Sequence, residues 1–363
     1  MSVSFYTRAI RPALFALDAE HAHNFTLAAL RRPIVVNTLR RRADRSLEQR
    51  LSEQVFGLAF RNPVGLAAGL DKQGTAVAAW SALGFGFAEV GTVTPRPQPG
   101  NPKPRLFRLQ SERAIINRFG FNSEGADGVA RNLADGTART GSLRLGINIG
   151  RNKDTPNDRA ADDYMQTIDT LHPFADYFAI NVSSPNTAGL RELQDSRPLR
   201  LLVEQTVARV AEQSPGRRIP VLVKFSPDQE ERDLLRSVDA AVEGGAAGII
   251  ATNTTVARPQ VTGRFAGEAG GLSGAPLKAA AHSICRVLFR HLGRRIPIVG
   301  VGGIFTADDA YERIRSGAAL VQIYTALVYE GPDMIHRLLT GLAVRLTRDG
   351  FSRIEDAIGA DVH

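Results

Sequence analysis

Eight short apolar runs alternate with amphipathic helical patterns from about residue 60 onward, and this rhythm constrains the fold more than any other feature. Because the runs are almost continuously apolar, they are typical of strands buried on both faces of a parallel sheet. The helical patterns between them include 199–213, 231–242, 277–292, 307–316 and 334–348. The strand candidates are 62–69, 87–93, 143–150, 176–183, 219–225, 248–254, 296–303 and 319–325.

Eight strand–helix units within 363 residues favour a closed (β/α)8 barrel over an open doubly wound sheet. Residues 1–46 lack this alternation of strand and helix patterns. Their sequence predicts two short helices, near 5–17 and 22–30, followed by the basic run Arg40-Arg41-Arg42. We therefore expect an α/β TIM barrel at 47–363 and a small N-terminal helical extension at 1–46.

The composition, with 43% apolar and 23% charged residues, is that of a soluble globular protein with a large core. The longest apolar stretches have the length of strands, so we expect no segment that spans a bilayer. The single cysteine, Cys285, excludes an internal disulfide, and it excludes a zinc or iron–sulfur centre held by this chain's own thiolates.

The net charge of +8 is concentrated at the N-terminus, where eight arginines against Asp18, Glu20 and Asp44 give 8 − 3 = +5 over residues 1–46. This excess favours an anionic surface as the partner of the segment. Nucleic acid is the alternative, but the chain has no recognised nucleic-acid motif and no aromatic residues within the basic run. The apolar residues expected on one face of the first helix, beside Arg8 and Arg11, are Phe5, Ile10, Leu14, Phe15 and Leu17.

Chemistry in such a barrel gathers at the C-terminal ends of the strands. Here the apolar runs finish on Asn, Thr, Lys or paired Gly, with hardly a Glu or Arg, a selection that polar turns alone do not favour. Lysine is rare, with five against 40 arginines, and yet Lys72 and Lys224 both follow strand candidates. A compact ammonium suits a flavin ring or a carboxylate as a point charge, although two ordinary surface lysines are the alternative.

A glycine pair, Gly302-Gly303, closes the seventh strand candidate in the string GVGGI, and QIYTAL follows at the eighth. The loops after strands seven and eight form the common phosphate site of these barrels, so we expect a phosphate-bearing cofactor or substrate there. His21 and His23 form an H-x-H pair, but residues at i and i+2 diverge on a helix, and no carboxylate or further histidine falls at a matching strand end. We therefore expect no metal site.

The stretch NVSSPNT, from Asn181 to Thr187, ends the fourth strand candidate and carries Ser183 and Ser184. No histidine lies near it in the sequence to activate either serine. The stretch is therefore either a turn or a catalytic site whose serine acts without an adjacent histidine.

Nine strings stand in order along the chain: GLAAGLDK, EVGTVTPRPQPGNPKPRLFRL, INRFGFNS, GINIGRNKDT, NVSSPNTAGLRELQ, ATNTT, GGLSGAPL, GVGGI and DAIGAD. Together they resemble the dihydroorotate dehydrogenase family, in its membrane-associated, quinone-dependent class (class 2), from about residue 5 to the C-terminus. That family oxidises dihydroorotate to orotate in de novo pyrimidine biosynthesis and binds FMN in a (β/α)8 barrel. The resemblance implies the same fold, cofactor and activity for this chain.

The resemblance also assigns site residues, which include the strand ends described above. The residues expected to hold FMN are Ala68, Gly69, Leu70, Asp71, Lys72, Thr92, Asn148, Asn181, Lys224, Thr252, Gly274, Gly303, Tyr324 and Thr325. The residues expected to surround dihydroorotate are Lys72, Asn117, Arg118, Phe119, Gly120, Phe121, Asn181, Asn186, Asn253 and Thr254.

In the resembling family the residue before Pro-Asn is the catalytic base, Cys in the soluble class and Ser in the membrane class. The resemblance thus makes Ser184 the base that takes a proton from C5 of the substrate, while a hydride leaves C6 for FMN. Because a free hydroxyl is a poor base, we expect Thr187 to pass the proton on through a water, with Phe121 shielding the site. Lys224 suits the negative charge that develops on the flavin.

The resemblance implies a quinone as electron acceptor, and the absence of a G-x-G-x-x-G fingerprint after a strand candidate disfavours NAD. The basic N-terminal helices fit a membrane surface, and the resemblance places His23 and Arg108 on the quinone route. A helix pair merely packed on the barrel is the alternative. The motifs begin near residue 5 and leave no room for a mitochondrial presequence. We therefore expect a bacterial protein, peripheral on the cytoplasmic side of the cytoplasmic membrane.

Three other functions stay open at this point. Another FMN barrel oxidoreductase acting on a pyrimidine or related ring has the same strand ends. A Schiff-base lyase uses Lys72 or Lys224 as nucleophile and holds a phosphorylated substrate on Gly302-Gly303. A non-catalytic membrane-surface module explains the N-terminus but not the strand ends. An oligomer is possible, and the sequence does not indicate its size.

Overall fold

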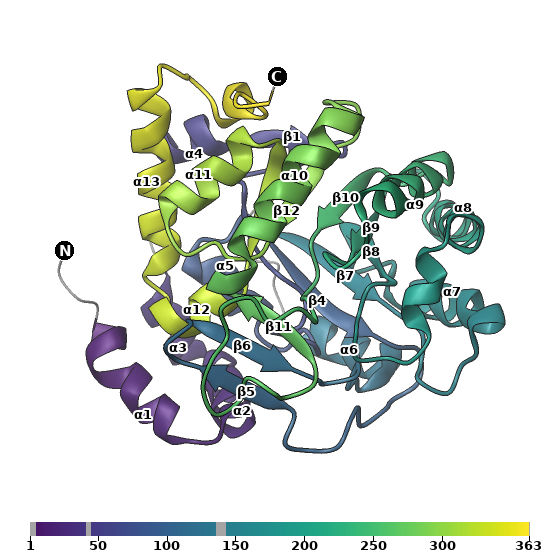
Figure 1. Ribbon diagram of the computed structural model, residues 1–363, viewed down its shortest axis with the longest axis horizontal. Coiled ribbons are helices and arrows are strands. Elements are labelled where there is room, and N and C mark those ends of the chain that lie inside the picture. Colours follow the sequence, from purple (N-terminus) through teal and green to yellow (C-terminus); the bar gives the residue numbers. More distant parts are fainter. Residues whose placement is uncertain (1–4, 41–44, 136–142, 363) are drawn as a thin grey trace.

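Eight parallel strands close into a barrel in the computed structural model, which describes residues 5–40, 45–135 and 143–362 (Figure 1). The order around the barrel is β10-β12-β13-β3-β4-β7-β8-β9. Each strand overlaps one of the eight runs predicted from the sequence, so the barrel prediction is confirmed. The strands are β3 (Val64–Leu66), β4 (Phe87–Val93), β7 (Arg144–Ile149), β8 (Tyr177–Asn181), β9 (Val221–Phe225), β10 (Gly248–Ala251), β12 (Ile298–Val301) and β13 (Ala318–Ile323).

Helices cover the outside of the barrel and bury one apolar stripe each, as Leu234, Val238 and Ala241 do in α9. The five helical patterns found in the sequence are confirmed to within a few residues. The barrel helices are α5 (Val77–Leu83), α6 (Gly125–Asp135), α7 (Ala160–Leu171), α8 (Ser196–Gln213), α9 (Glu231–Glu243), α10 (Lys278–Leu292), α11 (Ala307–Arg315), α12 (Thr325–Glu330) and α13 (Met334–Arg348). Single 3-10 turns are η2 (Asn157–Arg159), η3 (Leu190–Gln194), η4 (Ala275–Leu277) and η5 (Ile354–Ala357).

The barrel interior is filled by large side chains that face glycines on the neighbouring strands. A Cβ atom at Gly65 would lie 2.3 Å from the Phe87 ring, and one at Gly146 would lie 2.1 Å from the Tyr177 ring. Glycine is therefore required in β3 and β7 to admit the two rings, which close the barrel core below the mouth.

A hairpin of β1 (Glu53–Val55) and β2 (Leu58–Phe60) closes the N-terminal end of the barrel. A Cβ atom at Gly248, the first residue of β10, would lie 2.2 Å from the ring of Phe56. The ring of Phe60 packs edge-on against Phe87, with centroids 5.5 Å apart. This end is thus plugged by aromatic side chains, and the opposite end remains for a site.

A separate three-stranded antiparallel sheet lies across the mouth of the barrel (Figure 1). It contains β5 (Leu106–Leu109) and β6 (Ala114–Asn117), which follow β4, and β11 (Gly271–Gly274), which follows β10. Its own small core, which includes Ile116 and Leu272, is fully buried. This sheet, which we call the roof sheet, was not predicted from the sequence.

The N-terminal segment contains the π-helix η1 (Tyr6–Ile10), α1 (Arg11–Ala16) and α2 (Ala19–Leu30), so the two expected helices are confirmed. Two more helices, α3 (Pro33–Leu39) and α4 (Arg45–Leu51), follow and were not expected. Arg41 and Arg42 of the basic run lie outside the described residues. Helix α2 begins after Asp18, whose carboxylate accepts the N–H groups of Glu20 and His21, both at 3.0 Å.

The prediction of one apolar face on the first helix is wrong. Leu14 and Phe15 are half-buried on the barrel, while Phe5 and Leu17 are 73% and 48% exposed. The π-helical turn over Tyr6–Ile10 changes the side-chain register, which a regular helix period does not anticipate. Within the described residues, every helix is too short or too polar to cross a bilayer.

Candidate active site

Three polar side chains from adjacent strands interlock inside the mouth of the barrel. The Asn181 amide donates to Thr92 Oγ1 at 2.8 Å and to Asn148 Oδ1 at 3.2 Å, and the Thr92 hydroxyl donates to the same Asn148 oxygen. All three side chains are buried. Because each strand end holds the next, the amide of Asn181 is fixed in a single orientation.

A fully buried carboxylate, Glu89 in β4, lies next to this cluster. It accepts hydrogen bonds from Asn148 Nδ2 at 2.9 Å, from the Tyr177 hydroxyl at 3.1 Å and from Gln322 Nε2 at 2.8 Å. Three donors replace the water that the carboxylate cannot reach. The sequence analysis missed Glu89, although a glutamate inside an apolar strand is a recognisable signal.

Lys224, the next-to-last residue of β9, lies beside Asn181, with which it is paired in the β8–β9 register. Its side chain is buried, and burial lowers its pKa while the negative charge of Glu89 acts in the opposite direction. No described residue accepts a hydrogen bond from its ammonium or forms an ion pair with it. A buried cation in this state is available to an anionic ligand.

Two cavities open at this end of the barrel, and they share Ala68, Lys224, Asn253, Thr254 and Tyr324. Because five residues line both, the cavities form one elongated site with Lys224 at the junction. The first holds about 570 Å³, and its lining includes Thr252, Ser273, Gly274, Gly302, Gly303, Gln322 and Thr325. The second holds about 550 Å³, and its lining includes Gly69, Lys72, Thr92, Asn117, Phe119, Gly120, Phe121, Asn181, Ser184 and Asn186.

The far end of the first cavity is built from glycine backbone. Gly302 and Gly303 have φ values of +112° and +72°, and a Cβ atom at Gly303 would lie 2.4 Å from the Cα of Lys278. The loop can therefore follow this path only with glycine. Across from it, Ser273 Oγ and Thr325 Oγ1 are hydrogen-bonded at 2.8 Å. Backbone N–H groups and hydroxyls of this kind suit a phosphate.

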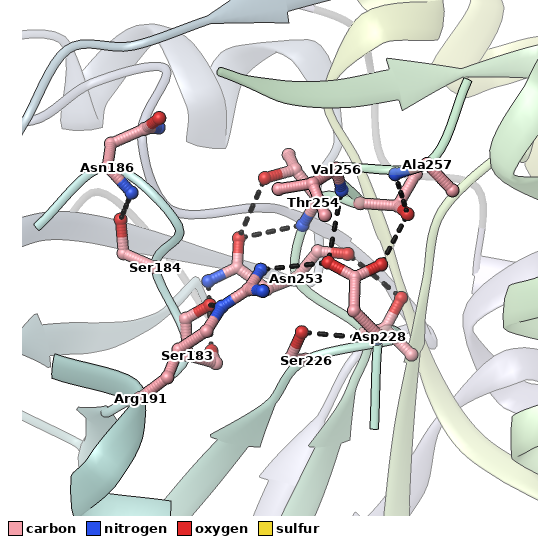
Figure 2. Close-up of polar contacts among 12 residues, drawn as sticks. Ser183, Ser184, Asn186, Arg191, Ser226, Asp228, Asn253, Thr254, Val256 and Ala257 are labelled. Carbon is pink, nitrogen blue, oxygen red and sulfur yellow. Dashed lines mark hydrogen bonds and ion pairs between the residues drawn. The ribbon is translucent and has the colours of Figure 1, made fainter. Parts of the chain in front are cut away.

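The Ser184 hydroxyl lies in the loop after β8, where its oxygen accepts the N–H of Asn186 at 3.2 Å (Figure 2). Its neighbour Ser183 faces the loop after β10, and its hydroxyl oxygen accepts the amide of Asn253 at 2.9 Å. The two serines thus have different partners. Ser183 holds the loop in place, while Ser184 lines the second cavity.

Thr187 and Phe121, the other predicted catalytic residues, are buried close to this loop. No described residue hydrogen-bonds the buried Oγ1 of Thr187. Phe121 has a φ of +55°, unusual for a bulky residue, and lies beside Thr92 where Gly150 leaves room. A Cβ atom at Gly150 would lie 3.0 Å from the Phe121 ring. Strain of this kind at a cavity wall is typical of functional sites.

An ion pair behind the loop joins three strand ends (Figure 2). Arg191 in η3 donates from Nε to the carbonyl of Ser183 at 3.3 Å and from Nη2 to Asp228 at 2.9 Å. Asp228 also accepts the Thr255 hydroxyl and the N–H of Val256 at 3.0 Å. This ion pair connects the loops after β8, β9 and β10, and the sequence analysis missed both of its members.

Lys72 lies in the loop after β3, where its ammonium contacts the face of the Phe119 ring at 3.6 Å and donates to Asn122 Oδ1. Burial, followed by the charge of Arg105, lowers its pKa well below the ordinary lysine value, and Glu20 opposes the shift. His23 of α2 lies on the same ring, with centroids 6.4 Å apart. Burial and Lys72 lower the pKa of His23 to about 4, so its imidazole is neutral at neutral pH.

Asparagines frame the second cavity on the side of the roof sheet. Asn186 Nδ2 donates to the carbonyl of Asn117 at 3.1 Å, and Asn101 Nδ2 donates to the carbonyl of Asn186 at 3.2 Å. The Asn253 carboxamide oxygen accepts the N–H of Thr254 at 2.8 Å. Amides that both donate and accept suit a flat heterocycle with amide-like edges.

Several predicted site residues direct their side chains elsewhere. The Arg118 guanidinium forms an ion pair with Glu268 at 2.6 Å and does not line either cavity. The Asp71 carboxylate accepts the N–H of Ala76 and the indole N–H of Trp80, both at 2.9 Å, and so shapes the turn into α5. Leu70, Asn148 and His23 are also absent from the lining of the two cavities.

Arg108 on β5 binds the N-terminal segment. Its guanidinium donates to the carbonyl of Leu14 at 3.0 Å and to that of Leu17, and it covers the Phe15 ring at 4.6 Å. It is thus placed between the roof sheet and α1, outside the two cavities. No group of three or more potential metal ligands occurs in the part of the chain that the structure describes.

The chain is similar to known proteins over nearly its whole length. The family model for dihydroorotate dehydrogenase matches residues 50–346. The dihydroorotate dehydrogenase (quinone) of Anaeromyxobacter sp. (strain Fw109-5) is 50% identical over 358 residues, which cover 98% of this chain and 97% of that one. The enzyme of the same name from Stenotrophomonas maltophilia (strain R551-3) is 49% identical over 346 residues, or 94% of this chain and 97% of that one.

Solved structures agree with these relatives. Ligand-free DHODH from Eimeria tenella is 39% identical and superimposes with a TM-score of 0.87, covering 95% of this chain and 100% of that one. The same enzyme in complex with ferulenol gives a TM-score of 0.85 over 94% of this chain and 95% of that one. This chain therefore belongs to the dihydroorotate dehydrogenase family.

Proposed function

We propose that this protein oxidises dihydroorotate to orotate in de novo pyrimidine biosynthesis, with FMN as cofactor and a quinone as electron acceptor. The relatives that match it over nearly its whole length carry the name dihydroorotate dehydrogenase (quinone). The observation that carries the proposal is the elongated site, with a glycine loop at one end, Ser184 at the other end, and at the junction Lys224, with which no described residue pairs.

FMN fits the first cavity by the chemistry of its lining. A phosphate needs N–H and hydroxyl donors, which Gly274, Gly303 and Thr325 supply, and Lys224 supplies a cation with which no described residue pairs. When bound, FMN takes a hydride from the substrate and passes the electrons on to a quinone. The residues we assign to its site are Ala68, Gly69, Leu70, Asp71, Lys72, Thr92, Asn148, Asn181, Lys224, Thr252, Gly274, Gly303, Tyr324 and Thr325.

Dihydroorotate fits the second cavity, whose lining includes amide groups and a lysine. Lys72 matches the substrate carboxylate, and the asparagines match the amide edges of its ring. We assign to the substrate Lys72, Asn117, Phe119, Gly120, Phe121, Asn181, Asn186, Asn253 and Thr254. Arg118 belongs to the same loop, and we assign it the role of stabilising that loop through its ion pair with Glu268.

Ser184 is the base in this proposal, and its hydroxyl takes the C5 proton of the substrate. Its proton then needs a path, because an unassisted serine hydroxyl is a weak base. The buried Oγ1 of Thr187, which no described residue hydrogen-bonds, supports a relay through a water, and Phe121 shields the pair from bulk solvent. A Ser184→Ala protein that reduces its flavin at the wild-type rate would contradict this assignment.

Residues 1–46 form the membrane and quinone-access unit in this proposal, and 47–363 form the catalytic barrel. Phe5, Phe25 and Ile34 are 73%, 64% and 76% exposed in a segment with excess positive charge, which suits an anionic membrane surface. His23 and Arg108 lie at the contact of this segment with the barrel and roof sheet, in accord with a quinone route there. The proposed location is the cytoplasmic side of a bacterial cytoplasmic membrane.

The membrane proposal is tested with vesicles that contain anionic lipid. We expect Phe25→Asp combined with Ile34→Asp to weaken vesicle binding and turnover with a long-chain quinone, but not turnover with a short-chain, water-soluble quinone. Leu201→Asp, which changes an exposed apolar residue of α8, is the matched control. Equal vesicle binding by the wild-type protein, the double variant and the Leu201→Asp control would refute the proposal.

The catalytic proposal is tested by the absorbance spectrum of detergent-purified protein, before and after anaerobic addition of dihydroorotate and then after a quinone. A yellow protein that bleaches with dihydroorotate and recovers with quinone is the expected result. A yellow protein that ignores dihydroorotate would remove the substrate assignment and leave another flavin oxidoreductase. A colourless protein that takes up no FMN would favour the lyase alternative.

A further inference from the structure

A buried arginine lies directly behind the glycine loop of the first cavity. Arg313 of α11 is 1% exposed. Its Nη2 donates to the carbonyl of Gly302 at 3.0 Å and to that of Lys278 at 3.3 Å, and its Nη1 donates to the carbonyl of Val301 at 3.3 Å. One guanidinium thus holds the end of β12, the glycine loop and the start of α10.

No carboxylate neutralises this guanidinium among the described residues. The two acids of α11 whose charges act on it, Asp309 and Glu312, both pair with Lys278 Nζ, at 2.5 Å and 3.3 Å, and Asp309 also accepts the N–H groups of Phe305 and Thr306. The Nε of Arg313 is buried without a hydrogen-bond acceptor. A buried charge in this state is unfavourable unless an opposite charge is bound nearby.

The hydrogen bonds of Arg313 also orient the loop. In a trans peptide the N–H points opposite to the carbonyl, so a Gly302 carbonyl held by Arg313 directs the N–H of Gly303 away from the guanidinium. No described residue accepts a hydrogen bond from the N–H of Gly302 or Gly303. The side chain reaches this position over Gly300, where a Cβ atom would lie 2.6 Å from Arg313 Cγ.

We propose that Arg313 is the positioning residue of an anion site at Gly302-Gly303, fixing the loop N–H groups toward the ligand and supplying the balancing charge from behind. It does not itself line the cavity, so it acts through the loop rather than by contact. The inference rests on the proposed function to the extent that the anion is the phosphate of FMN. It implies that Arg313 distinguishes phosphorylated from unphosphorylated flavin.

The test compares FMN with riboflavin, which lacks the phosphate, in titrations of apoprotein followed by flavin fluorescence. We expect Arg313→Gln to weaken FMN about 10- to 100-fold, the size of one uncompensated charge near a partly buried phosphate. Riboflavin should change by less than about threefold, because its ring and ribityl chain do not depend on the anion site. The control is Arg315, which lies on the same helix as Arg313 and forms ion pairs with Asp349 and Asp361. Arg315→Gln breaks these ion pairs and should leave both affinities unchanged.

Arg313→Lys keeps the positive charge but lacks the planar guanidinium that reaches three carbonyls. It replaces Arg313→Gln in the test if that variant does not fold. We expect it to weaken FMN about three- to tenfold and again to spare riboflavin. An equal loss of both flavins in both variants would show a purely structural role and overturn the inference. Unchanged affinity for FMN would also overturn it. A wild-type protein that binds no FMN would instead refute the proposed function.

Discussion

Glu20 on α2 and Arg105 before β5 form a buried ion pair, with Arg105 Nη2 2.8 Å from the Glu20 carboxylate. Arg105 also donates from Nη1 to the carbonyls of Pro99 at 2.7 Å and Asn101 at 2.9 Å. Since Asn101 in turn donates to Asn186 of the Ser184 loop, the N-terminal segment is connected to the candidate substrate site by four residues.

Replacing Glu20 by Gln should loosen the N-terminal segment rather than unfold the barrel. The change leaves Arg105 buried and unpaired, which costs about 3–5 kcal/mol. Burial raises the pKa of Glu20, but Arg105 outweighs it and the net pKa is lowered, so acidification through that lowered pKa should have the same effect. The measurement is limited trypsin digestion at Arg31, which lies between α2 and α3, with Glu204→Gln in an exposed pair as the control.

Thr187→Val should separate catalysis from stability. The hydroxyl is buried and no described residue bonds it, so its removal should leave the melting temperature unchanged or slightly raised. Anaerobic flavin reduction by dihydroorotate should slow about 10²-fold or more, because the proton from Ser184 loses its relay. Stopped-flow absorbance gives the rate. A variant that reduces its flavin normally would show that the relay does not pass through Thr187.

Orotate binding should take up a proton at Lys72. Because the pKa of Lys72 is lowered in the folded protein, the unfolded chain binds more protons between that lowered pKa and 10.5, and stability rises with pH across this window. A bound carboxylate raises the pKa of Lys72 again, so orotate binding takes up protons at any pH between the two pKa values.

Calorimetric titration of orotate in two buffers of different ionisation enthalpy measures this uptake. Lys72→Met should abolish the difference between the buffers, and Lys153→Met, at an exposed lysine, should preserve it. A wild-type binding enthalpy that is the same in both buffers would mean that Lys72 is already charged.

Glu89→Gln should change the protonation of Lys224. Burial lowers the pKa of Lys224, and Glu89 is the charge that opposes this, so the neutral variant should lower it further. The alkaline inflection in the pH dependence of flavin reduction should therefore move to lower pH. Tyr177→Phe removes one hydrogen bond to Glu89 without removing the charge and should leave the inflection in place. An inflection that stays fixed in Glu89→Gln would assign it to another group.

The barrel was predictable because its strands are buried on both faces and read as apolar runs, as in Val221–Phe225. The roof sheet was not, because β11, with the sequence GLSG, does not read as an apolar run and pairs with a strand about 150 positions earlier. That pairing depends on a barrel that first brings the two loops together.

The candidate site was predictable to a similar extent. Strand-end residues such as Asn181 and Lys224 meet because parallel strands end at one rim. The direction of a side chain was not predictable, so Arg118 was expected at the substrate but is bound to Glu268. Residues that stabilise the site loops without lining the cavities, such as Arg191 and Asp228, were missed because their roles come from contacts between separate loops.

The attachment of the N-terminal segment has a consequence for the order of protein synthesis. The Tyr6 hydroxyl donates to the carbonyl of Val328 at 2.7 Å, a partner 322 residues later, and Arg11 donates to Tyr329. At ribosomal speed this surface is completed roughly 15–60 s after the segment emerges. During that interval its apolar side chains have no barrel to pack on, so they stay exposed until the rest of the chain has been made.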